Sequence, residues 1–319
     1  MKMYIFIGGI NKIMIDFIKD KDTRKILLDY LRTNLIIRQT YYTNRLDKRI
    51  PNRLFRYTNL NEYVLSNLKE NELTVTNPEL FNDVYDGTIH RNTFPYAKKR
   101  FAELNNQLSN FGYSEIKKDM KYLKKDIEER DKFFMTFMRE DIRAACFSED
   151  EKSILMWSHY ANNNQGICME YDFTQNFNIM SLIYPIIYLD NPIDFTSLLE
   201  NPQNKDIEMS VLLSTIVKSK VWKYEKEWRL IFYFGGGNKL DDRVPIINIP
   251  VPKTIYLGNK FIHYWAKQSS THIFDEFCDY IESNNIPVKI IQNKILSYDF
   301  SCKHVNVHIL RKLDERFIK

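Results

Sequence analysis

Residues 221–234, VWKYEKEWRLIFYF, form the stretch with the strongest strand signal in the chain. Aromatic and β-branched side chains dominate it, which is typical of a strand. Side chains of a strand alternate between the two faces of a sheet, so Glu225, Glu227 and Arg229 are predicted to share one face. The flanking aromatic residues favour a strand that is central to the fold.

The polar face of this stretch has two interpretations. Two carboxylates beside an arginine can hold a cationic or hydroxylated ligand. The same residues can instead neutralise one another on a solvated outer face. The stretch alone leaves both interpretations open.

The rest of the chain alternates between strand and helix signals without a regular order. Strands are predicted at 54–59, 73–76, 144–148, 166–173, 183–190 (with Pro185 indicating an edge), 251–259 and 288–295, the last closing the sheet. Helices are predicted at 60–72, 153–164, about 204–219 and about 261–284. No GxGxxG or GxxxxGK[ST] loop follows any strand, which argues against Rossmann and P-loop folds. The expected fold class is α+β, a mainly antiparallel sheet with inserted helices.

Three parts are expected along the chain. Residues 1–50 have the apolar spacing of a helical extension, which Pro51 ends. Residues 51–300 form the α+β core domain, interrupted at about 96–141 by a charged helical insertion. Residues 301–319 form a C-terminal tail.

Composition limits the environment of the protein. The net charge of +5 is spread among interspersed acidic and basic residues, so no basic tail indicates nucleic acid. Four cysteines without CxxC spacing favour reduced thiols, and the absence of HExxH gives no reason to expect a metal. The apolar run after Lys2 lacks a cleavage site, and no segment has the length of a membrane helix. A cytoplasmic protein without a membrane partner is therefore expected.

Two further clusters are candidates for chemistry. FNDVYDG (81–87) contains Asn82, Asp83 and Asp86, although such side chains are also frequent in turns because they bond their own backbone. Trp157 and Tyr160 are predicted to share one face of a helix, where most such pairs simply belong to the core.

The blocks LFRYTN, FNDVYDG, ACFSED, MWSHYANNNQGICMEYD and KVWKYEKEWRLI occur in order between residues 54 and 258. In this order and spacing they resemble the bacterial domain-of-unknown-function 2971 family. The family name implies no activity.

A second, looser resemblance is to ADP-ribosyltransferase-like folds, which have a split sheet. They carry an Arg or His on a first strand, a Ser or Tyr on a second strand and a late ExE. Arg56 in LFRYTN, Ser148 in CFS and Glu225-Lys226-Glu227 match these positions. The resemblance implies a site that consumes NAD as substrate, with an unidentified acceptor that is protein or nucleic acid. Related architectures serve as toxins and antiphage effectors, so such a role is expected here.

The resemblance also implies roles for individual residues. Glu227 stabilises the positive charge that develops on ribose, and Glu225 orients or deprotonates the acceptor. Arg56 holds a pyrophosphate oxygen, while Ser148 positions the ribose or the glutamate. Arg229 does not fit this scheme, because an ion pair with Glu227 would give that glutamate a structural role instead of a catalytic one. The remaining residues expected to bind the cofactor are Tyr57, Trp157 and Tyr160, by stacking, together with Asn82 and Asp83.

Two other functions stay open. One is a metal-dependent nuclease that uses Asp83, Asp86 and Glu225. The other is a non-catalytic nucleotide-sensing or interaction module, in which the helical segments 1–50 and 96–141 bind a partner, protein or nucleic acid.

Overall fold

The computed structural model describes residues 50–88, 142–180, 182–195, 213–233, 241–246, 248–268, 272–294 and 296–312, with isolated positions between 122 and 140. The predicted N-terminal extension and the predicted insertion at 96–141 lie almost entirely outside these residues. Within the described ranges, no helix combines the length and the apolar character needed to cross a bilayer.

Ten strands in the described part of the chain form one sheet, and nearly all neighbours in it are antiparallel. The order is β12-β11-β10-β4-β1-β3-β2-β9, and β8 pairs with β3 on one side and β5 on the other. Only β10 and β11 run parallel within this sheet. The strands are β1 (Leu54–Thr58), β2 (Leu73–Thr76), β3 (Ile142–Ser148), β4 (Ile167–Tyr171), β5 (Ile183–Pro185), β8 (Glu227–Tyr233), β9 (Arg243–Ile246), β10 (Thr254–Leu257), β11 (Val288–Lys294) and β12 (Asp299–Val305). The expected α+β class with a mainly antiparallel sheet is confirmed.

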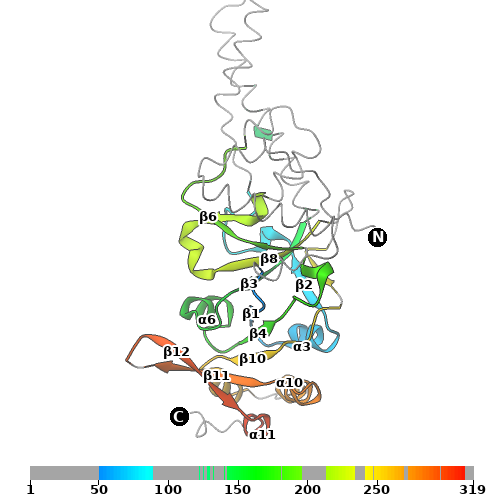
Figure 1. The fold of residues 1–319 in the computed structure, drawn as a ribbon, viewed down its shortest axis with the longest axis vertical. Helices are drawn as coiled ribbons and strands as arrows, with labels where there is room; N and C mark the ends of the chain where they lie inside the picture. The colour runs from blue at the N-terminus through cyan, green and yellow to red at the C-terminus, as the bar shows by residue number, and fades with distance from the viewer. Residues whose placement is uncertain are drawn as a thin grey trace, which may run out of the picture.

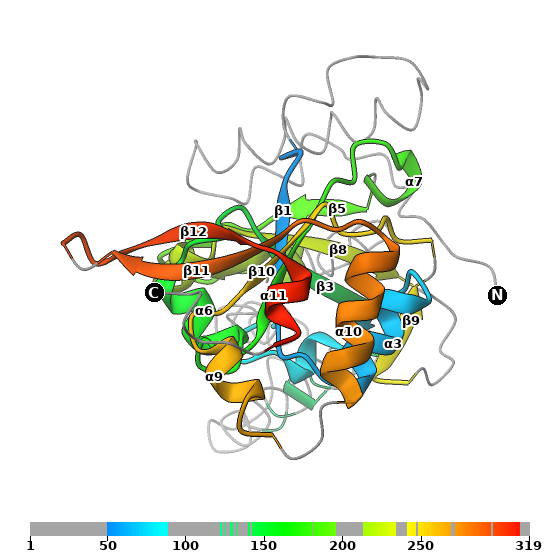
Figure 2. The ribbon, with the colours of Figure 1, turned by 90° about the horizontal axis from the view of Figure 1, so that it is seen from below.

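Helices cover the two faces of this sheet (Figures 1 and 2). α6 (Ile154–Tyr160) packs on the face of β1 that carries Phe55 and Tyr57, where a small apolar cluster forms. α3 (Glu62–Lys69) and α10 (His272–Ser283) pack against each other over the larger core. The other helices are η2 (Pro78–Leu80), α7 (Phe177–Met180), η3 (Lys220–Glu225), α9 (Phe261–Trp265) and α11 (Val307–Leu310), of which η2 and η3 are 3-10 helices.

Local sequence explains where α3 and α6 begin. The side chain of Asn61 accepts a hydrogen bond from the backbone N–H of Val64 at 2.9 Å, and Ser153 caps α6 through Met156 at 3.4 Å. Such caps satisfy backbone donors that have no partner inside the helix.

The sheet opens beside β3. β3 pairs with β8 along its whole length, from Ile142↔Tyr233 to Ser148↔Glu227. Its other edge meets β1 at one register position, Phe55↔Ser148, and β2 at one other, Thr76↔Ala144. Side chains therefore have room to enter the sheet where β1, β2 and β3 meet.

The prediction of one continuous strand over 221–234 is wrong at its N-terminal half. Lys220–Glu225 form the 3-10 helix η3, and Lys226 has the left-handed backbone conformation with φ 46°. β8 begins only at Glu227. The alternation of polar and apolar residues through KYEKEW is typical of a strand, but Glu225 lies buried at the end of η3.

Other boundaries differ from the predicted ones. The segment 183–190 divides at Ile186 into β5 and β6 (Ile187–Leu189), and β6 pairs in parallel with β7 (Val217–Ser219), where a helix was predicted. The predicted helix at 261–284 is two helices, α9 and α10.

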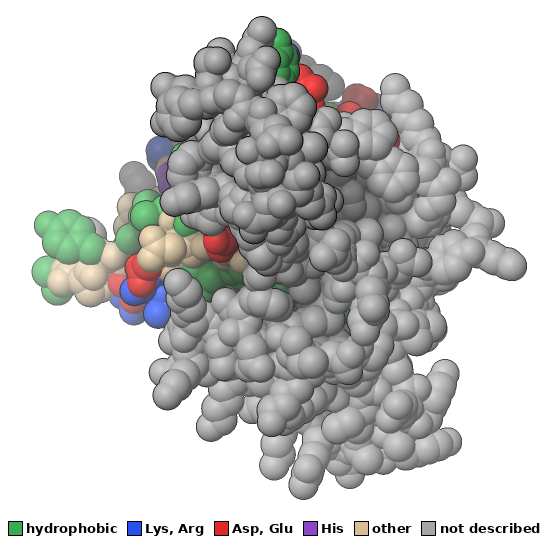
Figure 3. Space-filling view, turned by 90° about the horizontal axis from the view of Figure 1, so that it is seen from above, with side chains coloured by type: hydrophobic (Ala, Val, Ile, Leu, Met, Phe, Trp, Pro, Cys, Tyr) green, Lys and Arg blue, Asp and Glu red, His purple; other side chains and the backbone are tan. Residues whose placement is uncertain are grey.

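The sheet does not end at 288–295, because β12 pairs along all of β11. Most of β12 and the whole of α11 therefore lie within the segment 301–319 that was expected to be a tail. The tip of the β11–β12 hairpin projects to the left in Figures 2 and 3, where Leu296 and Tyr298 are 100% and 94% exposed.

Candidate functional site

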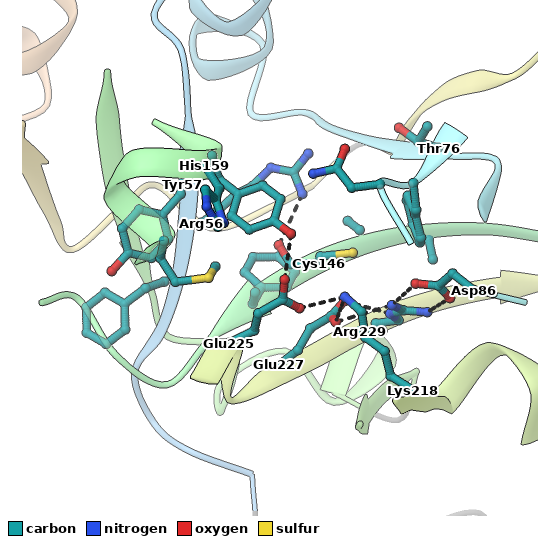
Figure 4. A pocket seen from close by; sticks show the side chains of 18 of the residues that line it. Arg56, Tyr57, Thr76, Asp86, Cys146, His159, Lys218, Glu225, Glu227 and Arg229 are labelled. Carbon is teal, nitrogen blue, oxygen red and sulfur yellow. Dashed lines mark hydrogen bonds and ion pairs between the residues drawn. The ribbon is translucent and has the colours of Figure 1, made fainter. Parts of the chain in front are cut away.

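A cavity of about 330 Å³ lies between α6, the opening in the sheet and the start of β8. We call it the α6 pocket (Figure 4). Most of its polar lining comes from distant parts of the chain: Arg56, Asn82, Asp86, Cys146, His159, Tyr160, Lys218, Glu225, Glu227 and Arg229. The volume is at the low end of the range of about 300–1,000 Å³ that is usual for small-molecule pockets.

Arg229 is the centre of a buried ion cluster on one wall of the α6 pocket. Its side chain has no solvent exposure and donates to both carboxylate oxygens of Asp86, at 2.6 and 2.5 Å. It also donates from Nε to Glu227 Oε1 at 2.7 Å and to the backbone carbonyl of Thr215 at 2.7 Å. A paired guanidinium of this kind fixes both carboxylates in position.

Lys218 joins the two glutamates. Its ammonium group donates to Glu225 Oε2 at 2.6 Å and to Glu227 Oε2 at 3.1 Å. The same group lies 4.8 Å from the centroid of the Trp222 ring. One buried lysine therefore holds both members of the pair, although η3 and β8 are different elements.

Glu225 has two further constraints. The Tyr160 hydroxyl donates to its Oε1 at 2.5 Å, from α6 across the pocket. Ser148 Oγ donates to the Glu225 backbone carbonyl at 2.6 Å, which fixes the end of η3 against the end of β3. The glutamate is 2% exposed, so these groups replace water as its partners.

This cluster contains three carboxylates and two cations. Asp86, Glu225 and Glu227 face Lys218 and Arg229 in the ion pairs and hydrogen bonds described above. Among the described residues, the cluster thus contains one more carboxylate than cations.

The environment separates the pKa values of the two glutamates. Burial raises the pKa of Glu225, and the carboxylate of Glu227 raises it further, against the lowering effects of Lys218 and Tyr160. Burial also acts to raise the pKa of Glu227, but Arg229 and Lys218 outweigh it and lower that pKa to about 2. Glu227 is therefore ionised at all physiological pH values, and Glu225 is the better proton acceptor.

Arg56 occupies the opening in the sheet, above the glutamates in Figure 4. Its Nη1 contacts the carbonyl of Cys146 on β3 at 3.4 Å, and its Nη2 contacts the carbonyl of Thr74 on β2 at 3.3 Å. Both distances are longer than usual for such bonds. Burial lowers the pKa of Arg56, and none of the opposing groups is a carboxylate. Within the described residues this guanidinium has no anionic partner.

The structure brings together most of the residues that the sequence analysis selected. Arg56, Asn82, Tyr160, Glu225 and Glu227 all line the α6 pocket. Arg229 also forms an ion pair with Glu227, which is the structural role that the sequence left open for it. Both residues nevertheless line the cavity.

Two predicted stacking residues are placed differently. Trp157 is fully buried, donates its indole N–H to the Glu151 carbonyl at 2.7 Å and does not line the pocket. Tyr57 reaches the pocket wall, but its hydroxyl donates to the Asp150 carbonyl and its ring packs edge-on against Trp157. The prediction that Trp157 stacks on a ligand is wrong, because its ring belongs to the core under α6.

Ser148 and Asp83 do not line the α6 pocket either. The Ser148 hydroxyl is occupied by the Glu225 backbone, so of its two expected roles only positioning of the glutamate fits. Asp83 accepts a hydrogen bond from the backbone N–H of Tyr85 at 2.9 Å. This is the turn interaction that the sequence offered as the alternative to a role in ligand binding. It lies on a neighbouring cavity of about 320 Å³.

Sequence reasoning missed two pocket residues of consequence. Lys218 lay in a predicted helix and carried no motif, so only the fold reveals it. Cys146 on β3 is paired with Arg229 on β8, so the two side chains lie on the same face of the sheet. Burial raises the pKa of the Cys146 thiol well above its ordinary value.

Of the three residues proposed for a nuclease, Asp86 and Glu225 line the α6 pocket, whereas Asp83 lies on the other cavity. Both carboxylate oxygens of Asp86 accept hydrogen bonds from Arg229. In the described ranges no three or more His, Cys, Asp or Glu side chains group in a way that could hold a metal ion.

A family model described as "Protein of unknown function (DUF2971)" matches residues 156–230. This range is shorter than the expected 54–258 and includes Tyr160, Lys218, Glu225, Glu227 and Arg229, but not Arg56 or Asp86. Comparison with curated proteins and with solved structures gives no match.

Proposed function

From residues 156–230, which match the DUF2971 family model, and from the pocket that several of them help to line, we propose that the protein binds NAD and transfers its ADP-ribose group. The α6 pocket supports this proposal by one arrangement above all. A glutamate pair whose pKa values are driven in opposite directions lies across a cavity from a guanidinium that has no anionic partner in the described residues. Paired titratable groups with separated pKa values are typical of acid–base sites.

Glu227 carries the electrostatic role. Breaking the bond between ribose C1′ and the nicotinamide nitrogen leaves the electron pair on nicotinamide and positive charge on the ribose. A carboxylate that is ionised at every working pH and held by Arg229 stabilises that charge without reorganisation.

Glu225 carries the proton-transfer role. The acceptor attacks C1′ with a lone pair from oxygen or nitrogen and must lose a proton. Glu225, with its raised pKa, takes that proton, and Tyr160 and Lys218 hold its carboxylate in place. The products are free nicotinamide and the ADP-ribosylated acceptor.

Arg56 and Tyr160 provide the binding contacts. Arg56 lines the pocket, and its N–H groups make only long contacts to two backbone carbonyls. These N–H groups can therefore donate to a pyrophosphate oxygen. Tyr160 lines the pocket and replaces Trp157 as the aromatic surface for nicotinamide. The volume accommodates the nicotinamide–ribose end, and the adenosine end extends beyond it.

The test is release of nicotinamide from NAD, followed by chromatography, with cell extract as the source of acceptor. Glu227→Gln keeps the shape of the side chain and removes its charge, so release falls by roughly 100-fold or more. Glu62→Gln, an exposed glutamate at the start of α3, is the matched control and leaves the rate unchanged. Equal rates for Glu227→Gln and the parent protein would rule out the proposed chemistry.

A second function has its own support. Every carboxylate oxygen of Glu225 and Glu227 already accepts a hydrogen bond from the protein, as expected of a pair that is structural rather than reactive. A nucleotide-binding module without turnover would show heat of NAD binding in calorimetry but no nicotinamide release.

The proposal also places the protein in the cytoplasm, where a toxin or antiphage effector that consumes NAD would act. All four cysteines are free thiols, as is usual for cytosolic proteins.

A further inference from the structure

Arg56 lines two cavities. Besides the α6 pocket, a cavity of about 260 Å³ lies under α3, which we call the α3 pocket. Arg56 and Thr76 line both. The α3 pocket lies on the face of β1 that carries Arg56 and Thr58, opposite the face that α6 covers.

The two terminal nitrogens of the Arg56 guanidinium make contacts in different cavities. Nη1 contacts the carbonyl of Cys146, which lines the α6 pocket, and Nη2 contacts the carbonyl of Thr74, which lines the α3 pocket. Each contact is a long one, so neither cavity fully satisfies the charge.

The α3 pocket has a second cation. Arg243, on β9, lines it and is exposed, and no ion pair joins it to another described residue. Among the described residues of the lining, Glu72 is acidic and Arg56 and Arg243 are basic, which gives two positive charges and one negative charge. An anion is therefore favoured there over a cation.

Neutral hydrogen-bonding groups in the lining are ordered. Thr74 Oγ1 accepts from Asn67 Nδ2 at 2.8 Å and shares a second hydrogen bond with the Tyr63 hydroxyl. Two arginines with ordered hydroxyl and amide groups are a usual setting for a phosphate group.

We infer that the α3 pocket is a second anion site, which binds a phosphate group between Arg56 and Arg243 and competes with the α6 pocket for Arg56. A phosphate on the α3 side draws Nη1 away from the α6 side. Occupation of the α3 pocket then weakens binding of a nucleotide in the α6 pocket, a coupling that rests on the proposed function. Phosphate binding itself does not rest on it.

The experiment is calorimetric titration with inorganic phosphate, without NAD, at constant ionic strength. Arg243→Gln removes a charge-assisted bond and weakens phosphate binding by roughly tenfold or more. Glu72→Gln removes the opposing charge and tightens binding. Lys253→Gln, which removes an exposed cation outside the pocket, leaves binding unchanged.

Adenosine monophosphate is the second probe and distinguishes the source of the phosphate. Tighter binding than inorganic phosphate, lost in Arg243→Gln, indicates the phosphate of a nucleotide, while equal binding indicates free phosphate. Absence of phosphate binding, or equal binding by Arg243→Gln and the parent protein, would overturn the inference.

The coupling is measured separately, as NAD affinity with and without saturating phosphate. Phosphate lowers NAD affinity roughly fivefold or more in the parent protein and has no effect in Arg243→Gln. Undiminished NAD affinity in the parent protein would refute competition for Arg56. Failure of NAD to bind at all would refute the proposed function and leave the phosphate titration as the independent test of the α3 pocket.

Discussion

The side chain of Arg229 shows how strongly the pocket depends on single residues. It is wholly buried and is held by Asp86 and Glu227 at hydrogen-bonding distance. Removing one partner of a buried ion pair leaves an uncompensated charge away from water. The free-energy cost of that charge exceeds the net stabilisation that the intact pair provides.

We predict that Asp86→Asn lowers the free energy of unfolding by roughly 3–5 kcal/mol, measured by urea denaturation. The control is Asp190→Asn, which breaks an exposed pair with Lys220 at 3.1 Å and costs less than about 1 kcal/mol. Equal effects of the two variants would show that the buried cluster is not stabilising.

The pKa of Glu227 predicts a loss of stability in acid. Its pKa is about 2 when folded and rises to its ordinary value when unfolded, so its stabilising effect is full above the unfolded pKa and is lost as pH falls toward 2. The loss is on the order of 3 kcal/mol. Denaturation at a series of pH values should show a steeper fall between about pH 5 and pH 2 in the parent protein than in Glu227→Gln. Parallel slopes would contradict the depressed pKa.

The pKa of Glu225 predicts the pH dependence of transfer. Because its pKa is raised and the base must be ionised, the rate should increase as pH rises through that pKa. Glu225→Gln should lose this limb of the profile and slow transfer by roughly 100-fold or more. A pH profile that is unchanged in Glu225→Gln would assign the proton transfer to another group.

Among the elements, the turn from α6 into β4 depends on a glycine. A Cβ on Gly166 would lie 2.3 Å from the carbonyl oxygen of Thr58 and 3.0 Å from the backbone of Ala161. Neither backbone can move without disturbing the pairing of β1 and β4. Gly166→Ala should therefore destabilise the protein by roughly 1–3 kcal/mol in urea denaturation, while the exposed Ser66→Ala changes stability by less than about 0.5 kcal/mol. Full stability of Gly166→Ala would mean that the turn is not as close as described.

The elements that sequence predicted well have local causes. α3 has its Asn61 cap and the apolar residues of one helical face. β1 and β2 lie within segments predicted as strands, and β3 begins two residues before the strand predicted at 144–148. The turn at 220–226 could not be predicted in this way. Its conformation follows from tertiary contacts of Glu225 with Tyr160, Lys218 and Ser148, and strand-like alternation in the sequence carries no trace of them.

At the scale of the whole molecule, the site consists of segments between residues 56 and 229. Its strand residues meet because β3 pairs with both β1 and β8. Motif order was enough to select Arg56, Tyr160 and the glutamates. It was not enough for Lys218, whose position depends on the pairing of β6 with β7, or for the burial of Trp157. Only the positions of α6 and of the sheet opening distinguish Tyr160, which lines the pocket, from Trp157, which belongs to the core.

The most direct test is a crystal structure of Glu227→Gln, which binds NAD without consuming it, grown with saturating NAD. The account predicts a pyrophosphate oxygen within about 2.7–3.2 Å of Arg56 and the nicotinamide ribose in the α6 pocket beside residues 225 and 227. An α6 pocket without the dinucleotide, or NAD bound on another surface, would contradict it.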